Sequence, residues 1–156
     1  MAVTTVVFDV GETLVDEARY AASGDPRRAF STEDIHPDAL ACLAVLRERG
    51  LRLGAAGNMR AVHEAFLHEH VDAVGSSESW DAWKPAPAFF AHVAAMMRAE
   101  PSEIVYVGDR VDNDVVPALA FGMSAVRIRR GAHADIESPA GTTVIHSLAE
   151  LPDVLP

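Results

Sequence analysis

The order of apolar and polar residues first predicts a buried strand near the start of the chain. Residues 6–8 are all apolar, without alternation. Asp9 follows them directly and precedes a turn that contains Gly11 and Thr13. An apolar run of this kind is typical of a central parallel strand that is covered on both faces. Because ligands of open α/β sheets bind beyond the carboxyl ends of the strands, Asp9 is predicted to lie at a binding site.

The rest of the chain alternates between strand and helix patterns. Apolar runs predict further strands at 51–56, 71–74, 104–107 and 125–128, with a last short strand at 143–145. Apolar residues at helical spacing, bounded by Pro and Gly, predict helices at about 37–49, 60–69, 87–98 and 113–121. Strands that alternate with helices imply βαβ units, and therefore an α/β protein with a mostly parallel sheet and helices on both faces.

Length and composition fit one globular domain. The chain has 156 residues, of which 49% are hydrophobic. Its net charge of −10 argues against a nucleic-acid partner and disfavours an anionic membrane surface. No apolar run approaches the ~18 residues of a membrane span. Cys42 is the single cysteine, so no disulfide can form within the chain, and we predict a cytoplasmic location.

Four stretches of the sequence resemble the motifs of the haloacid dehalogenase-like (HAD) superfamily. They are Asp9 with Thr13 four residues later, Gly57-Asn58, Lys84-Pro85, and Gly108-Asp109 with Asp114 five residues beyond. The resemblance implies a Rossmann-like core with strand order 5-4-1-2-3. Many members insert a helical cap after the first motif, and the interval 16–35 is too short for one. We therefore expect a capless or cap-deleted single domain, 1–156, with a homodimer or another partner covering the open site.

The resemblance also implies a role for each motif residue. Asp9 would attack phosphorus and carry a covalent intermediate, and Lys84 would neutralise the charge of nucleophile and substrate. The residues expected to hold Mg²⁺ through oxygen atoms are Asp9, Gly11 by its carbonyl, Asp109 and Asp114. The residues expected to contact the phosphate group are Thr13, Gly57, Asn58 and Lys84.

Two positions depart from the family pattern. Most phosphatases of the family carry a second Asp where this chain has Gly11, and its carboxyl protonates the leaving group and later activates water. General acid–base help of this kind is typically worth ~10²–10⁴-fold in rate, so slow turnover is expected. Glu12 is adjacent, but an adjacent side chain usually points elsewhere. At Gly57 the family usually has Ser or Thr, so a hydroxyl contact to the phosphoryl group is lost.

Structural interpretations compete with these roles. Asp9 and Asn58 can cap a turn or a helix, and the polar run 112–114 can cap a helix and offset its dipole. An isolated Lys84 would be an ordinary surface lysine. Capping explains one acid of the run, but not its pairing with Asp109 at a strand end. The seven histidines show no metal-ligand spacing and are predicted to be surface or structural residues.

The motif set predicts Mg²⁺-dependent hydrolysis of a small-molecule phosphate ester through an aspartyl-phosphate on Asp9. A 2-haloacid dehalogenase is a second hypothesis, because those relatives also lack the second Asp of the first motif. They need no metal, however, and Asp109 and Asp114 disfavour that interpretation. A non-catalytic binding protein is a third, favoured by Gly11, Gly57 and the missing cap. Assays on a panel of phosphate esters, with and without Mg²⁺, are the most informative test of these hypotheses.

Overall fold

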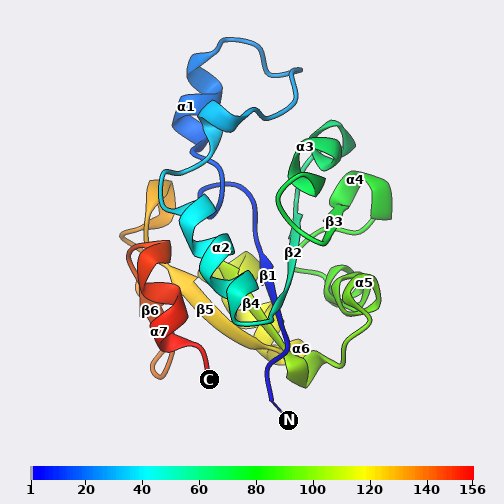
Figure 1. Ribbon diagram of the computed structural model, residues 1–156, viewed down its shortest axis with the longest axis vertical. Helices are drawn as coiled ribbons and strands as arrows, with labels where there is room; N and C mark the ends of the chain where they lie inside the picture. Colours follow the sequence, from blue (N-terminus) through cyan, green and yellow to red (C-terminus); the bar gives the residue numbers. More distant parts are fainter. Residues whose placement is uncertain (1) are drawn as a thin grey trace.

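The computed structural model describes residues 2–156 and shows one parallel sheet between two layers of helices (Figure 1). In that range the sheet has six strands in the order β3-β2-β1-β4-β5-β6, and all neighbouring strands are parallel. The strands are β1 (Thr5–Phe8), β2 (Arg52–Gly57), β3 (Ala73–Ser76), β4 (Ile104–Gly108), β5 (Ser124–Ile128) and β6 (Thr143–Ile145). The helices are α1 (Glu17–Ala22), α2 (Ala39–Glu48), α3 (Glu64–His68), α4 (Ser77–Trp80), α5 (Pro87–Met97), α6 (Val116–Phe121) and α7 (Leu151–Val154). The predicted α/β class is confirmed, and β6 extends the predicted five-strand order beyond β5.

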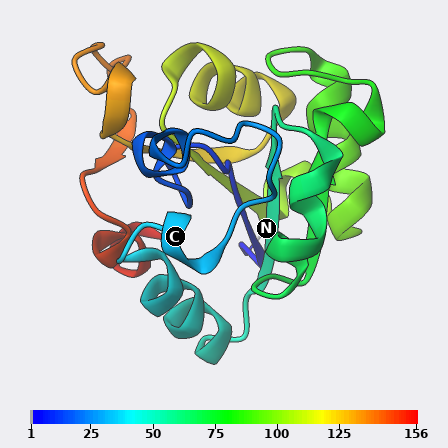
Figure 2. The same ribbon diagram turned by 90° about the horizontal axis from the view of Figure 1, so that it is seen from above.

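The sheet has a hydrophobic core on each face, and the central strand β1 contributes side chains to both of these cores. Val6 and Phe8 are fully buried on the side covered by α2 and α7, whereas Val7 is fully buried on the side of α5 and α6. Figure 2 shows α2 and α6 on opposite sides of the sheet. A strand covered on both faces needs apolar residues at every position, which explains the unbroken run before Asp9.

Element boundaries differ from the predictions where polar side chains organise the backbone. Helix α1 lies inside the predicted linker, begins after the N-cap Asp16 and buries none of its six residues, so it leaves no apolar periodicity. Helix α4 has only four residues after the N-cap Ser76 and was predicted as loop. Strand β3 begins later than the predicted 71–74, because Asp72 precedes it and accepts a hydrogen bond from the Leu53 N–H at 2.8 Å.

The segment 16–38 forms an excursion beyond the carboxyl ends of the strands, where α1 stands above the sheet in Figure 1. Arg28 holds it together through two hydrogen bonds to Asp34, at 2.6 and 2.8 Å. The Phe30 ring stacks on His63 with 3.6 Å between ring centroids, and the Phe30 N–H donates to His63 Nδ1 at 3.1 Å. His63 lies between β2 and α3, so these contacts fasten the excursion to the rest of the fold.

We expect His63 to make this attachment sensitive to acid. Burial of the ring, and then the charge of Arg60, lower the pKa of His63 to about 4. An unfolded histidine titrates near ~6.5, so between these values only the unfolded state binds the proton, and stability falls as pH falls. The free energy of unfolding should drop by about 2 kcal/mol from pH 7 to pH 5 on this account. Urea titrations of wild type and His63→Gln at both pH values measure it, and equal pH dependence in the two proteins would contradict it.

Candidate active site

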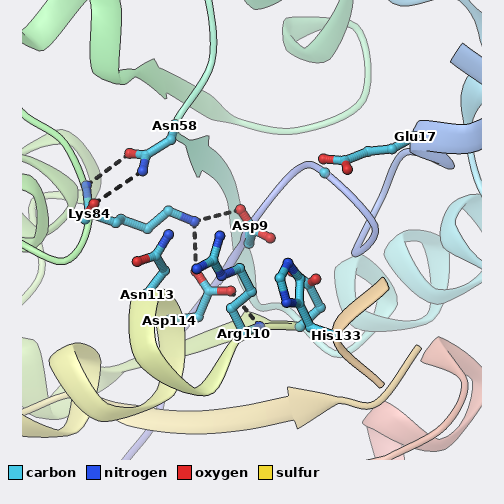
Figure 3. A pocket seen from close by; sticks show the side chains of 10 residues that line it. Asp9, Glu17, Asn58, Lys84, Arg110, Asn113, Asp114 and His133 are labelled. Atoms are coloured by element: carbon cyan, nitrogen blue, oxygen red, sulfur yellow. Dashed lines mark hydrogen bonds and ion pairs between the residues drawn. The ribbon is translucent and has the colours of Figure 1, made fainter. Parts of the chain in front are cut away.

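Three neighbouring strands bring polar residues to one edge of the sheet. Asp9 follows β1, Asn58 follows β2 and Asp109 follows β4, and these strands are adjacent. The Asp9 N–H donates to the Val107 carbonyl at 2.8 Å, which fixes the turn where β1 ends. A cavity of about 190 Å³ opens there, and Figure 3 shows its polar side chains converging. The polar cavity therefore lies at the carboxyl ends of the strands, which is where the sequence predicts the site.

Asp9 is held by two side chains from different parts of the chain. Lys84 Nζ donates to Asp9 Oδ1 at 2.6 Å, and Thr13 Oγ1 donates to Asp9 Oδ2 at 3.3 Å. Asp9 is 6% exposed, so its carboxylate is nearly dry yet faces the cavity. A carboxylate fixed at both oxygens and kept from bulk water is well placed for nucleophilic attack.

Lys84 joins two carboxylates inside the protein. Its Nζ also donates to Asp114 Oδ1 at 2.6 Å, and the Phe89 and Tyr106 rings each lie 5.7 Å from Nζ. Burial acts to lower the pKa of Lys84, but the charge of Asp9 and that of Asp114 raise it well above the usual lysine value. The ammonium is therefore charged at neutral pH, and the interpretation of Lys84 as a solvated surface residue is wrong.

Asn58 positions Lys84 instead of capping a helix. Its Oδ1 accepts from the Lys84 N–H at 2.8 Å, and its Nδ2 donates to the Lys84 carbonyl at 3.2 Å. These two bonds clamp the loop before α5 onto the end of β2. Lys84 is also the single lysine of the chain, since all other basic residues counted with it are arginines.

Asp114 reaches the site from a π-helical turn, 111–115, that precedes α6. The Arg110 N–H donates to Asp114 Oδ2 at 2.9 Å, while Asp114 Oδ1 accepts the hydrogen bond from Lys84 Nζ. Gly108 makes room for this side chain, because a Cβ at that position would overlap the Asp114 carboxyl group. A π-turn frequently marks a functional site, and here it re-aims one acid into the cavity. The predicted helix 113–121 therefore begins differently from a regular α-helix.

The three acids expected to bind metal do come together. One carboxylate oxygen from each of Asp9, Asp109 and Asp114 lies within 4.8 Å of the others, and all three residues are buried. Burial, followed by the charge of Asp9, raises the pKa of Asp109 to about 9 and that of Asp114 to about 6. The single positive charge of Lys84 does not offset the charge of three crowded carboxyl groups. A divalent cation that prefers oxygen ligands would offset it. The donor set therefore suits Mg²⁺.

The two glycines of the site differ in what surrounds them. A Cβ on Gly57 would lie 3.2 Å from Asp9 Oδ1, so this glycine lets the Asp9 carboxylate lie close to the end of β2. Gly11 lines the cavity, and its φ angle is not positive, so its backbone conformation does not require glycine. The phosphate contacts expected of Thr13, Gly57 and Asn58 stay predictions, because their observed hydrogen bonds and close approaches are to Asp9 and Lys84.

Four further residues line the cavity and were not predicted as site residues: Glu17, Arg110, Asn113 and His133. Arg110 and Asn113 fall within the fourth motif stretch, so their neighbourhood was visible in the sequence. His133 comes from the loop after β5 and Glu17 from α1, and neither carries a sequence signal. Burial, and then the charges of Glu12 and Asp9, raise the pKa of Glu17.

Comparisons with known proteins agree with this geometry. A family model described as HAD-hydrolase-like matches residues 82–151. The chain is 39% identical over 108 residues to the glyceraldehyde 3-phosphate phosphatase of Methanopyrus kandleri, which covers 65% of this chain and 46% of that protein. It is 34% identical over 127 residues to the phosphatase of the same name from Methanocaldococcus jannaschii, which covers 77% of this chain and 56% of that one. The chain thus spans about half the length of these curated relatives.

Solved structures match the fold over nearly the whole chain. A HAD phosphatase from Thermococcus onnurineus superposes with a TM-score of 0.76 at 20% identity, covering 99% of this chain and 97% of that one. The fold and the strand-tip aspartate, lysine and paired acids define an α/β protein of the hydrolase type. The chain belongs to the haloacid dehalogenase-like superfamily.

Proposed function

We propose that the chain hydrolyses a small phosphate ester, with Mg²⁺ bound at its acidic cluster and with Asp9 as the nucleophile. The observation that carries the proposal is the contact of one buried ammonium, Lys84 Nζ, with Asp9 and Asp114 at 2.6 Å each. A structural ion pair would need one carboxylate. Two carboxylates with Asp109 beside them, open to a cavity, suit a site that receives an anion together with a cation.

Each side chain has a task in the proposed reaction. Asp9 attacks phosphorus, the ester P–O bond breaks, and its electron pair leaves with the alcohol oxygen. Lys84 offsets the charge of the nucleophile and of the phosphoryl oxygens, and Thr13 keeps the other Asp9 oxygen in place. Bound Mg²⁺ would supply additional charge neutralisation for the phosphoryl group. Water then displaces phosphate from Asp9 and restores the free carboxylate.

The substrate class follows from the cavity and the relatives. A cavity of about 190 Å³ accommodates a phosphoryl group with a short carbon chain. Several relatives act on such compounds by name, among them two glyceraldehyde 3-phosphate phosphatases and a dihydroxyacetone phosphatase from Corynebacterium glutamicum. We therefore propose phosphorylated three-carbon alcohols, aldehydes and ketones as the first esters to test. Phosphate release from such a panel, with Mg²⁺ and with chelator, tests the function, and no release from any ester would overturn it.

A 2-haloacid dehalogenase is the second candidate, and Gly11 favours it. The chain is 33% identical over 110 residues to the (S)-2-haloacid dehalogenase of Xanthobacter autotrophicus, covering 68% of this chain and 43% of that protein. The crowded acids Asp109 and Asp114 favour the phosphatase, because halide displacement needs no cation. Chloride release from (S)-2-chloropropionate in the presence of chelator would establish the dehalogenase, and its absence beside phosphate release would exclude it.

We expect Mg²⁺ to stabilise the protein. A ligand that binds only the folded state adds about 1.4–2.7 kcal/mol at 10–100 times its Kd, or roughly 3–10 °C in Tm for a chain of this size. Asp109→Asn should lose most of this shift, whereas Asp153→Asn, on α7 and away from the cavity, should keep it. Differential scanning calorimetry with and without Mg²⁺ measures the shift, and ¹⁵N-lysine labelling reports on Lys84 alone. An unchanged Tm and an unmoved lysine resonance would count against the metal site.

Location and assembly stay predictions. Across the described residues, each helix falls short of the length and apolarity that a bilayer span needs. The cytoplasmic location and the homodimer expected from the missing cap rest on the sequence, and light scattering over a range of protein concentrations tests the dimer.

A further inference from the structure

Gly11 lacks the side chain that the proposed reaction needs, and a different carboxylate occupies its place. A Cβ built on Gly11 would overlap Glu17 Oε1, and Glu17 Cδ lies 3.0 Å from that position. Glu17 is also a lining residue of the cavity that contains Asp9. Figure 3 shows its carboxylate directed from α1 toward the turn after Asp9. The volume left by the glycine therefore contains a carboxyl group.

We infer that Glu17 is the general acid and general base of the proposed reaction, acting from α1 across the space that Gly11 leaves open. The inference rests on the proposed function, because it assigns a further group to the same site. It also gives the segment 16–38 a task, since this excursion is what carries Glu17 to the cavity. Tyr20 of α1 packs edge-on against Phe30 and His63, with ring centroids 4.9 and 5.8 Å apart, which fastens the helix that carries Glu17.

Backbone contacts fix Glu17 in this position. Its N–H donates to Glu12 Oε1 at 2.8 Å, and the preceding Asp16 N–H donates to the Asp34 carbonyl at 2.8 Å. The Asp16 side chain then accepts from the Arg19 N–H at 3.1 Å and starts α1. The first turn of α1 is thus tied to the loop after β1 and to the end of the excursion, which limits where the Glu17 side chain can reach.

Glu12, the other nearby carboxylate, is engaged elsewhere. Its φ angle of 63° turns the chain, and one of its oxygens accepts from the Glu17 N–H. The other oxygen packs against Gly131, where a Cβ would overlap it. Glu12 does not line the cavity. Its role is to hold Glu17, which explains why the residue next to Gly11 is not the replacement acid.

Both steps balance with one carboxyl group. In the first, Asp9 forms an O–P bond, the ester P–O bond breaks, and the departing alkoxide takes the proton of Glu17. In the second, the Glu17 carboxylate takes a proton from water as the water oxygen bonds to phosphorus. The P–O bond to Asp9 breaks and its electron pair returns to the carboxylate. The products are the alcohol and inorganic phosphate, and Glu17 is again protonated.

The test of Glu17 compares a poor leaving group with a good one, and so separates attack on the ester from hydrolysis of the phosphorylated protein. Glu17→Gln should lower turnover of glycerol 3-phosphate about 100-fold, because an alkoxide needs a proton. With p-nitrophenyl phosphate, whose leaving group needs no acid, the variant should release one equivalent of nitrophenol in a burst. The phosphorylated protein should then accumulate and be visible by mass spectrometry after acid quench. Glu33→Gln, an exposed acid of the same excursion outside the cavity, is the matched control and should behave as wild type.

A rescue variant sharpens the test. Gly11→Asp should restore turnover when Glu17 is alanine, because the backbone at residue 11 tolerates a side chain and its space is then free. In the wild-type background it should gain little, since the two carboxylates compete for one volume. Wild-type turnover by Glu17→Gln on glycerol 3-phosphate, with Asp9→Asn inactive, would overturn this inference and leave the phosphatase standing. A wild-type protein inactive on every ester would overturn both.

Discussion

Asp9→Asn is expected to reduce phosphate release by at least ~10³-fold while leaving the protein folded. Asparagine has the same shape but cannot form the acyl phosphate, so the loss should appear on esters with good and poor leaving groups alike. Asp9 crowds two other acids, and its charge raises the pKa of Asp109 and of Asp114. Removing that charge should therefore hold Tm constant or raise it, which is unusual for a change at a buried residue.

Phosphate-release assays and calorimetry on the same preparation measure both parts. Asp153→Asn, the same chemical change on the exposed face of α7, controls for effects of net charge and should retain wild-type activity. Full activity in Asp9→Asn would refute the nucleophile assignment. A large fall in Tm would show that Asp9 mainly supports the fold through its contact with Lys84.

Lys84→Met should be the most destabilising substitution in the site. The two side chains have similar length, but the variant leaves the Asp9 and Asp114 carboxylates without their ammonium partner. Removing one partner of a buried ion pair typically costs about 3–5 kcal/mol. Activity should also fall by at least ~10²-fold, because the charge that offsets the developing phosphorane is gone.

The pH dependence of the stability of Lys84→Met tests whether the lost ion pairs cause the destabilisation. The folded-state pKa of Lys84 is raised, so its stabilisation is present at neutral pH and is lost only as pH rises through that raised value. Asp114 has a pKa of about 6 beside Lys84, and without the ammonium it will take up a proton at higher pH. The stability gap between wild type and variant should thus narrow as pH falls toward 5. Urea titrations at pH 8 and pH 5 measure the gap, and a gap that widens in acid would contradict the ion-pair explanation.

Much of the site was predictable because each motif residue lies next to a strand or turn that the local pattern reveals. Asp9 and Asp109 both follow apolar runs, and parallel strands put their carboxyl ends at one edge. That argument needs no knowledge of tertiary contacts. Asn58 shows the limit of this argument. The sequence predicts its position at a strand end, but not that its side-chain amide bonds to the backbone of Lys84.

Glu17 and His133 were missed for a physical reason. Neither follows a strand, and each is carried to the cavity by a segment with little apolar periodicity, α1 in one case and the loop after β5 in the other. Position in such segments is decided by aromatic and polar contacts between distant residues, such as the stacking of Phe30 on His63 and the hydrogen bond between them. No local pattern encodes those contacts.

The sequence by itself determined the α/β class, the central strand and the chemical groups placed at the strand ends, because strand periodicity and chain order act locally. Only the tertiary structure decided that Lys84 bonds to both Asp9 and Asp114, and that the Glu17 carboxylate fills the space beside Gly11. Lys84 and Asp9 are 75 residues apart in sequence, so their contact depends on how whole elements pack. A missing side chain likewise says nothing in sequence about what occupies its volume, which close packing in the folded chain decides.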